Sequence, residues 1–104
     1  MSVIFKKDVR LGISLPVLQK EWECYHPHEQ QEILLQWEKI RGTIPDRISE
    51  LESIINKKQE RLGEETNFEA SCQLNLDISE LASIINDLWI WYRSNQELSQ
   101  KVHM

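Results

Sequence analysis

The run CYHPHE at residues 24–29 brings together the side-chain types best suited to chemistry. Thiolate, imidazole and carboxylate groups are the usual protein ligands of zinc, so Cys24, His26 and His28 form a candidate metal-binding group. Their spacing matches no common structural zinc pattern, Pro27 interrupts the run, and no paired CxxC sequence occurs elsewhere. We therefore prefer a simple connector between two helices, and we predict no metal ligands and no cofactor.

Nucleophilic catalysis is the second chemistry that the residue types suggest. Either Cys24 or Cys72 would need activation by a neighbouring histidine. Cys72 lies one helical turn after Phe68, so we expect it to pack as a small hydrophobe. The sequence has no glycine-rich phosphate-binding loop and no pair of carboxylates isolated on an apolar face. These observations predict a protein that is not an enzyme.

Length and charge narrow the class of protein further. A chain of 104 residues with 40% hydrophobic content supports one core, so we expect a single domain over residues 1–104. A net charge of −5 argues against binding nucleic acid through its phosphates. Charged residues interrupt residues 1–15, and no apolar run approaches the roughly 20 residues that span a bilayer. Two distant cysteines suit a reducing compartment, so we expect a cytoplasmic protein.

The elements that hold these residues should be helices. Three glycines and three prolines leave little material for the tight turns of an all-β fold, so the sequence predicts an all-α fold. Residues 1–12 form an N-terminal arm whose structure the pattern leaves undecided. Ser14 is a plausible N-cap with Pro16 in the first turn, which predicts a short helix over 15–25.

A second helix is expected over 27–41. Pro27 suits its first turn, and Gly42 ends or bends it. Whether residues 28–62 form two helices or one kinked helix stays open. One buried face follows the helical spacing of three, four and seven: Ile33, Leu34, Trp37 and Ile40.

The strongest periodicity predicts a helix over 43–63. Thr43 is the expected N-cap. Gly63 is the expected C′ residue, because glycine accepts the left-handed conformation. Lys58 takes the one polar slot of an a/d seam of coiled-coil type. The apolar members of this seam alternate steps of four and three: Ile44, Ile48, Leu51, Ile55 and Leu62.

The last helix is expected over 66–94, opened by a capping box from Thr66 to Glu69. Because only a few residues separate it from the preceding helix, the two helices must run antiparallel. Residues 95–104 are polar and are expected to fray. The second seam repeats the same steps: Leu74, Ile78, Leu81, Ile85, Leu88 and Tyr92.

The two helices of this hairpin differ in length. Residues 67–94 extend about 40 Å, against about 28 Å for residues 44–62. The surplus segment at 88–92 is apolar all round and must be covered. We expect helix 27–41 with Trp37 to cover it, helped by the short helix that carries Trp22. The predicted fold is an antiparallel, coiled-coil-like hairpin with one or two short N-terminal helices packed on its Trp-rich end.

Aromatic residues at this end are the candidate partner-binding site. Successive helical residues point about 100° apart, so Trp89, Trp91 and Tyr92 cannot all face one neighbour. Tryptophan and tyrosine are common in binding hot spots, and we assign these three residues and Trp37 to partner binding. For Trp89, Trp91 and Tyr92 a role in the core of the bundle is the first interpretation and an exposed anchor the second, and at least one of the three is a candidate contact surface. Residues 66–104 carry five acidic and two basic side chains, which suits a basic partner.

The run NFEASCQLNLDISEL at residues 67–81 resembles the UVR motif, a helical hairpin of excinuclease subunits B and C and of Clp-type ATPases and their adaptors. The resemblance extends over about 35 residues, from 46 to 81. Asn75 replaces the arginine that the family prefers, and Ser71 and Cys72 stand where alanines are common. The residues that match are Phe68, Glu69, Leu74, Asp77, Ile78, Glu80 and Leu81.

The resemblance implies a protein–protein docking element, often self-associating and without chemistry of its own. Together with the two seams, it predicts a bacterial interaction or adaptor protein that presents its hairpin to another protein or to a second copy of itself. We expect no direct nucleic-acid partner and no membrane. The alternatives are a regulatory subunit of a nucleic-acid-processing enzyme and, third, a metal-binding protein that uses Cys24, His26 and His28.

Overall fold

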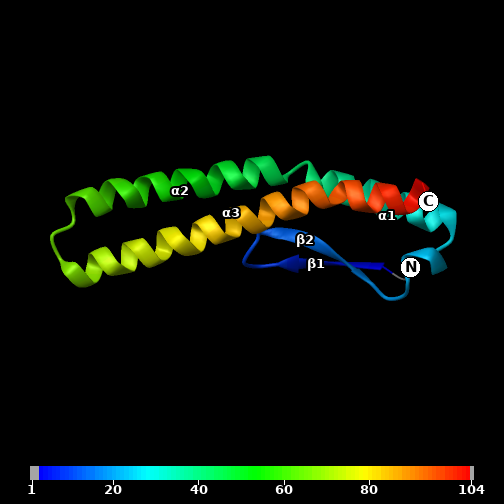
Figure 1. Ribbon diagram of the computed structural model, residues 1–104, viewed down its shortest axis with the longest axis horizontal. Helices are drawn as coiled ribbons and strands as arrows, with labels where there is room; N and C mark the ends of the chain where they lie inside the picture. The colour runs from blue at the N-terminus through cyan, green and yellow to red at the C-terminus, as the bar shows by residue number, and fades with distance from the viewer. Residues whose placement is uncertain (1–2, 104) are drawn as a thin grey trace.

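The chain forms a long helical hairpin with a small β-hairpin against one half of it (Figure 1). The computed structural model describes the backbone of residues 3–103 and the side chains of residues 5–93. The molecule measures 60 × 20 × 18 Å along its principal axes. In chain order the elements are β1 (Val3–Asp8), β2 (Ile13–Leu18), the 3-10 helix η1 (Trp22–Cys24), α1 (Pro27–Arg41), α2 (Ile44–Glu64) and α3 (Phe68–His103).

The β-hairpin corrects the all-α prediction and the helix expected over 15–25. β1 and β2 pair antiparallel, and Phe5 lies opposite Pro16. Proline at the second position does not itself exclude a helix, since α2 begins in the same way with Ile44 and Pro45; residues 13–18 are a strand because they pair with β1. Proline is tolerated in this strand because both strands of a two-stranded sheet are edges. Residues 1–2 of the N-terminal arm lie outside the described residues, and the rest of the arm is β1 and the turn.

The turn between β1 and β2 depends on Gly12 and Asp8. Gly12 has a φ of +78°, a left-handed conformation that glycine adopts at little cost. Its N–H donates to the Asp8 carbonyl at 2.7 Å, and the Asp8 carboxylate accepts from the Leu11 N–H at 2.8 Å. The turn therefore holds Leu11 and Arg10 in fixed directions beside the helices.

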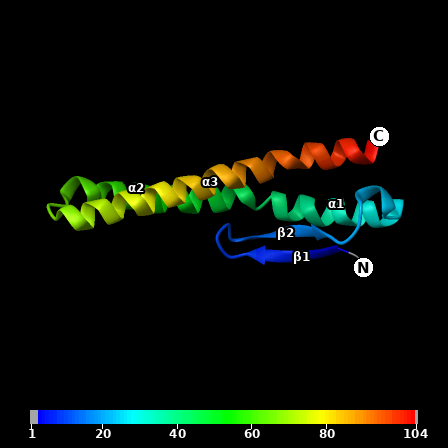
Figure 2. The same cartoon turned by 60° about the horizontal axis from the view of Figure 1, so that its bottom comes forward.

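The junction of α1 and α2 answers the question that the pattern left open. Gly42 has a φ of −63° and keeps the right-handed conformation, so α2 follows α1 in almost the same direction (Figures 1 and 2). Thr43 does not cap α2, because its hydroxyl donates to the Ile40 carbonyl at 2.7 Å. Pro45 has no N–H for the helical ladder, which accounts for a break at this point. Residues 28–62 are two helices joined by a short right-handed turn.

The turn between α2 and α3 lies close to the predicted place but uses other residues. Gly63 is not a left-handed C′ residue, since α2 continues to Glu64 and Gly12 alone has a positive φ among the described residues. The cap of α3 is Asn67, whose side chain accepts from the Ala70 N–H at 2.9 Å, and not Thr66. The Glu65 carboxylate accepts from the Asn67 N–H at 3.0 Å. Side-chain hydrogen bonds thus make this turn without a glycine.

α3 continues to His103, which corrects the helix end predicted at residue 94, while fraying of residues 95–104 stays a prediction. No glycine or proline follows Gly63, so no residue type in this segment ends a helix. Side chains beyond residue 93 and the whole of Met104 lie outside the described residues. Among the helices of the described backbone, none combines the length and apolarity that crossing a bilayer demands.

The main core lies where α1, the first half of α2, the second half of α3 and the β-hairpin meet. The aliphatic seams of α2 and α3 enter it, and Trp37 of α1 covers Leu88, as predicted. Trp22 was expected to help there but packs in a separate cluster with Tyr25 and Ile33. The buried members of the main core are Leu11, Ile13, Trp37, Ile44, Ile48, Leu51, Ile84 and Leu88.

Candidate functional site

The aromatic residues assigned to partner binding occupy different environments. Trp37 is 0% exposed, so it is a core residue and offers no contact surface. Trp91 is half-buried and packs edge-on against Trp37, with 5.6 Å between the ring centroids. The burial of Trp37 agrees with the buried face that the spacing of helix 27–41 predicted, and it disagrees with the assignment of this residue to partner binding.

Tyr92 and Trp89 form a partly open aromatic stack between α3 and α1. The Arg41 guanidinium lies 4.7 Å from the Tyr92 ring centroid, and Trp89 packs edge-on against Tyr92 at 5.5 Å. The pKa of Arg41 is raised, mainly by its hydrogen bond to Glu38, so the guanidinium over the Tyr92 ring stays protonated. Trp89 is 41% exposed and its neighbour Ile90 is 50% exposed. Ile90 was not among the predicted contact residues, although its position in an all-apolar run marked it.

A second exposed apolar surface lies on α3 near the α2–α3 turn. We call Phe68, Cys72 and Leu76 the arm stripe, since a spacing of four residues puts all three on one helical face. Phe68 is 81% exposed and Leu76 is 65% exposed. Cys72 is exposed as well, which corrects the expectation that it packs as a core hydrophobe. The pattern contained this second line of apolar residues opposite the seam, but the stronger seam concealed it.

The arm stripe belongs to a part of the molecule where two helices run without cover. We call residues 50–80 the arm: the β-hairpin turn reaches its base at Glu50, Leu51 and Glu80, and beyond this base α2 and α3 extend with no third element beside them in either view (Figures 1 and 2). The seam is looser toward the tip, because Ile55 and Leu62 are only half-buried while Leu51 is buried. Leu51 and Leu74 are still buried within the seam of the arm, whereas its apolar side chains outside the seam, such as Phe68 and Leu76, have no third element to cover them.

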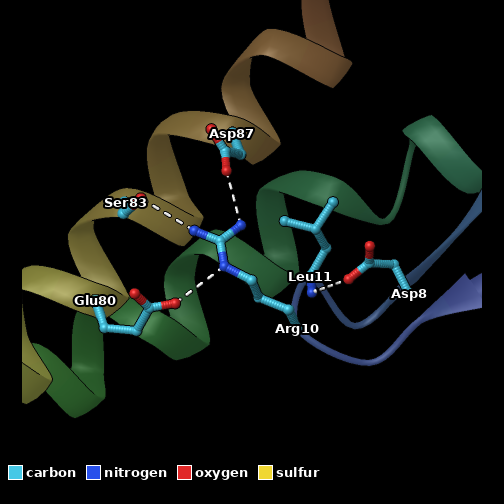
Figure 3. Close-up of polar contacts among 6 residues, drawn as sticks. All are labelled: Asp8, Arg10, Leu11, Glu80, Ser83 and Asp87. Carbon is cyan, nitrogen blue, oxygen red and sulfur yellow. Dashed lines mark hydrogen bonds and ion pairs between the residues drawn. The ribbon is translucent and has the colours of Figure 1, made fainter.

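Arg10 joins the β-hairpin turn to α3 at the base of the arm (Figure 3). Its Nε donates to Glu80 at 2.9 Å, its Nη1 to Asp87 at 2.7 Å, and its Nη2 to the Ser83 hydroxyl at 3.0 Å. Hydrogen bonds to Asp87 and then Glu80 raise the pKa of Arg10. All three acceptors lie on one flank of α3, so the guanidinium is held across two turns of the helix.

A second ion pair links the two helices of the arm. Lys58, the polar member of the α2 seam, lies 3.2 Å from the Asp77 carboxylate on α3. A hydrogen bond from Gln73 at 2.8 Å and the Lys58 ammonium together lower the pKa of Asp77. The polar slot in the predicted seam is therefore used for a charge pair between the helices.

The candidate metal-binding run serves to start α1. The His26 ring nitrogen Nδ1 accepts from the His28 N–H at 3.3 Å, and the Glu29 carboxylate accepts from the His26 N–H at 3.1 Å. The His28 ring lies 3.1 Å from Glu32, one turn along the helix. No group of three or more His, Cys, Asp or Glu side chains that could hold a metal ion occurs among the described residues. These contacts favour the connector interpretation of this run.

A hollow of about 550 Å³ lies between the β-hairpin turn and the start of α2. Two of its charged groups are paired with each other: Arg47 donates to Glu50 at 3.2 Å, and also to the Leu11 carbonyl at 3.1 Å. Gly12 and Thr43 complete much of its wall. This lining does not set a nucleophile beside a base.

We compared the chain with protein-family models, curated proteins and solved structures, and none of them matches it. The likeness of residues 46–81 to the UVR motif therefore stays a prediction.

Proposed function

We propose that this protein is a non-catalytic interaction or adaptor module that docks through the α2–α3 hairpin. The observation that carries the proposal is the set of large apolar side chains exposed along α3. Phe68 and Leu76 stand on the arm, and Trp89 and Ile90 stand in the packed half of the molecule. Exposed apolar side chains grouped on one element are typical of protein-binding surfaces, whereas single ones are common on any protein.

The two exposed apolar sites on α3 differ in how firmly their side chains are held before a partner binds. Trp89 is held against Tyr92, so its conformation is restricted before binding and less side-chain entropy is lost on contact. Phe68 stands almost free at the tip of the arm. Docking can therefore use a fixed anchor at one site and an adaptable contact at the other. Another protein and a second copy of this chain are both compatible with this surface.

Site-specific photo-crosslinking in the native cell tests the proposal. A benzophenone amino acid at Leu76 or Ile90 should give discrete heavier species containing this protein. The same probe at Leu35 on α1, which is 60% exposed but isolated, should give only background. Light scattering during chromatography then shows whether the heavier species are self-associated copies. A monomeric protein with equal background at all three positions would exclude the proposed function.

A further inference from the structure

We propose that the arm stripe binds a basic, amphipathic helical segment of another protein. The inference rests on the proposed docking function and adds the chemistry of the partner. An exposed line of Phe68, Cys72 and Leu76 at four-residue spacing extends about 12 Å along α3. A partner helix that places apolar residues at the same spacing can pack along this line.

The charge of the chain is concentrated on the arm. Residues 50–80 hold eight acidic and three basic side chains, a net charge of −5, although Glu80 and Glu50 at the limits of this range are paired with Arg10 and Arg47 from outside it. The remaining residues hold nine of each sign and are neutral overall. An elongated molecule keeps this charge away from its neutral half, so the arm presents a local negative field to approaching partners. The field favours a basic partner.

The acidic side chains lie beside the arm stripe. Glu69 follows Phe68 directly, and Glu80 lies one turn after Leu76. Both carboxylates are exposed. A helix packed on the stripe would therefore bring its own flanking residues near Glu69, where a lysine or arginine would be favoured, while Glu80 is already paired with Arg10.

The molecule already contains an example of such a contact. Arg10 approaches the same helix from the β-hairpin turn and is held by Glu80, Ser83 and Asp87 (Figure 3). A hydrophobic residue next to it in sequence, Leu11, is buried in the core. Arg10 and Leu11 thus show that α3 can bind a basic side chain whose neighbour in sequence is a buried apolar residue.

Charge also separates this partner from a second arm. Two arms packed side by side would bring two regions of net charge −5 together, and like charges across an interface cost binding energy. Nucleic acid is disfavoured by the same field. A basic helical segment is the occupant for which both the apolar line and the charge are favourable.

A labelled model peptide tests the inference directly. The probe is an amphipathic peptide of about 18 residues, with leucines at steps of three and four and lysines elsewhere. Binding to the full-length protein is measured by fluorescence anisotropy. We expect saturable binding that weakens as the salt concentration rises, because screening reduces the attraction between exposed charges. Circular dichroism checks that every variant keeps its helices.

Two pairs of variants separate the apolar and the charge contributions. Phe68→Ser with Leu76→Ser should raise the dissociation constant at least tenfold, roughly the effect of losing a hot spot, while Leu35→Ser leaves it unchanged. Glu60→Gln with Glu69→Gln should raise it by about threefold or more, whereas Glu21→Gln with Glu23→Gln, also exposed but outside the arm, should not.

Three outcomes overturn the inference. Equal weakening by Leu35→Ser would show that the peptide adheres without using the stripe. Binding of a glutamate version of the peptide as tight as that of the lysine version would remove the charge requirement, while dependence on Phe68 and Leu76 would keep the docking function. The third outcome has two parts: the peptide fails to bind the wild-type protein, and the wild-type protein forms a dimer that the Phe68 and Leu76 changes break. That result would make a second copy of the chain the occupant of the stripe.

Discussion

The packed half of the molecule and the arm are built on the same two seams yet differ in their cover. In the packed half, α1 and the β-hairpin add to α2 and α3, and side chains such as Trp37 and Leu88 are fully buried. In the arm the same aliphatic steps continue with only two helices, and Ile55 and Leu62 stay half-buried. A regular seam therefore specifies that two helices pair. The elements packed around that pair decide how much apolar surface is buried and how much stays exposed.

The difference between the halves should be largest for equivalent leucines of the two seams. Leu88→Ala in the packed half should lower the free energy of unfolding by about 3–5 kcal/mol, because a fully enclosed side chain leaves a cavity. Leu62→Ala near the tip should cost about 1 kcal/mol, since half of that side chain already meets water. Urea denaturation measures both, and equal losses would show that the arm is as well packed as the core.

Gly12→Ala tests how tightly the β-hairpin turn is bound to the helices. A Cβ on Gly12 would lie 2.6 Å from Arg47 Nε, and the φ of +78° disfavours alanine. We expect a loss of about 1–3 kcal/mol, the usual cost of a left-handed non-glycine residue. Amide hydrogen exchange should show the loss first in β1 and β2. Unchanged exchange there would mean that the hairpin is not coupled to α2 through this turn.

Gly63→Ala should act in the opposite direction at the other end of the molecule. Gly63 lies within α2, has no positive φ, and has nothing within 4 Å of a Cβ built on it. Alanine should therefore raise the free energy of unfolding by about 0.5–1 kcal/mol, because it favours the helix. The same urea titration measures the gain. A loss would restore the left-handed C′ role that the sequence suggested.

Asp77→Asn probes the charge pair of the arm and should have the smallest effect. The hydrogen bond from Gln73 and the Lys58 ammonium lower the pKa of Asp77 in the folded protein, so its carboxylate contributes stability above its ordinary pKa of 3.8. That contribution disappears as the pH falls through the lowered pKa. The melting temperature of wild type should exceed that of the variant at neutral pH and converge with it in acid. A constant difference would assign the effect to packing.

The comparison of the halves also explains which features the sequence could predict. The helical hairpin follows from local steps of four and three, which survive in any surroundings. The β-hairpin does not, because its two short strands gain stability from Leu11 and Ile13 in the core and from Arg10 on α3. Arg10 and its acceptor Glu80 are 70 residues apart in sequence, and a contact at that separation leaves no local pattern. The local signals of Ser14 as an N-cap and Pro16 in a first turn therefore predicted a helix where β2 lies.

The candidate site could be predicted only in part. Trp89 belongs to the exposed surface, as the rotation of 100° per residue required of at least one aromatic residue in its segment. Trp37 was assigned both to the buried face of helix 27–41 and to partner binding, and its full burial agrees with the first of these assignments. Phe68 and Leu76 were visible as apolar residues opposite the seam, yet Phe68 was interpreted through its place in a capping box. Exposure is a property of the assembled fold, and composition of one helix does not determine it.

The grip of Arg10 on Glu80, Ser83 and Asp87 has a consequence for how the long helices align. Repeated aliphatic residues tolerate sliding by one heptad, about 10 Å, because leucine and isoleucine replace one another along the interface. A guanidinium that needs three particular acceptors admits only one of these alignments. The small N-terminal turn thereby acts as a stop against slippage, and it determines how far the tip of the hairpin projects into solution.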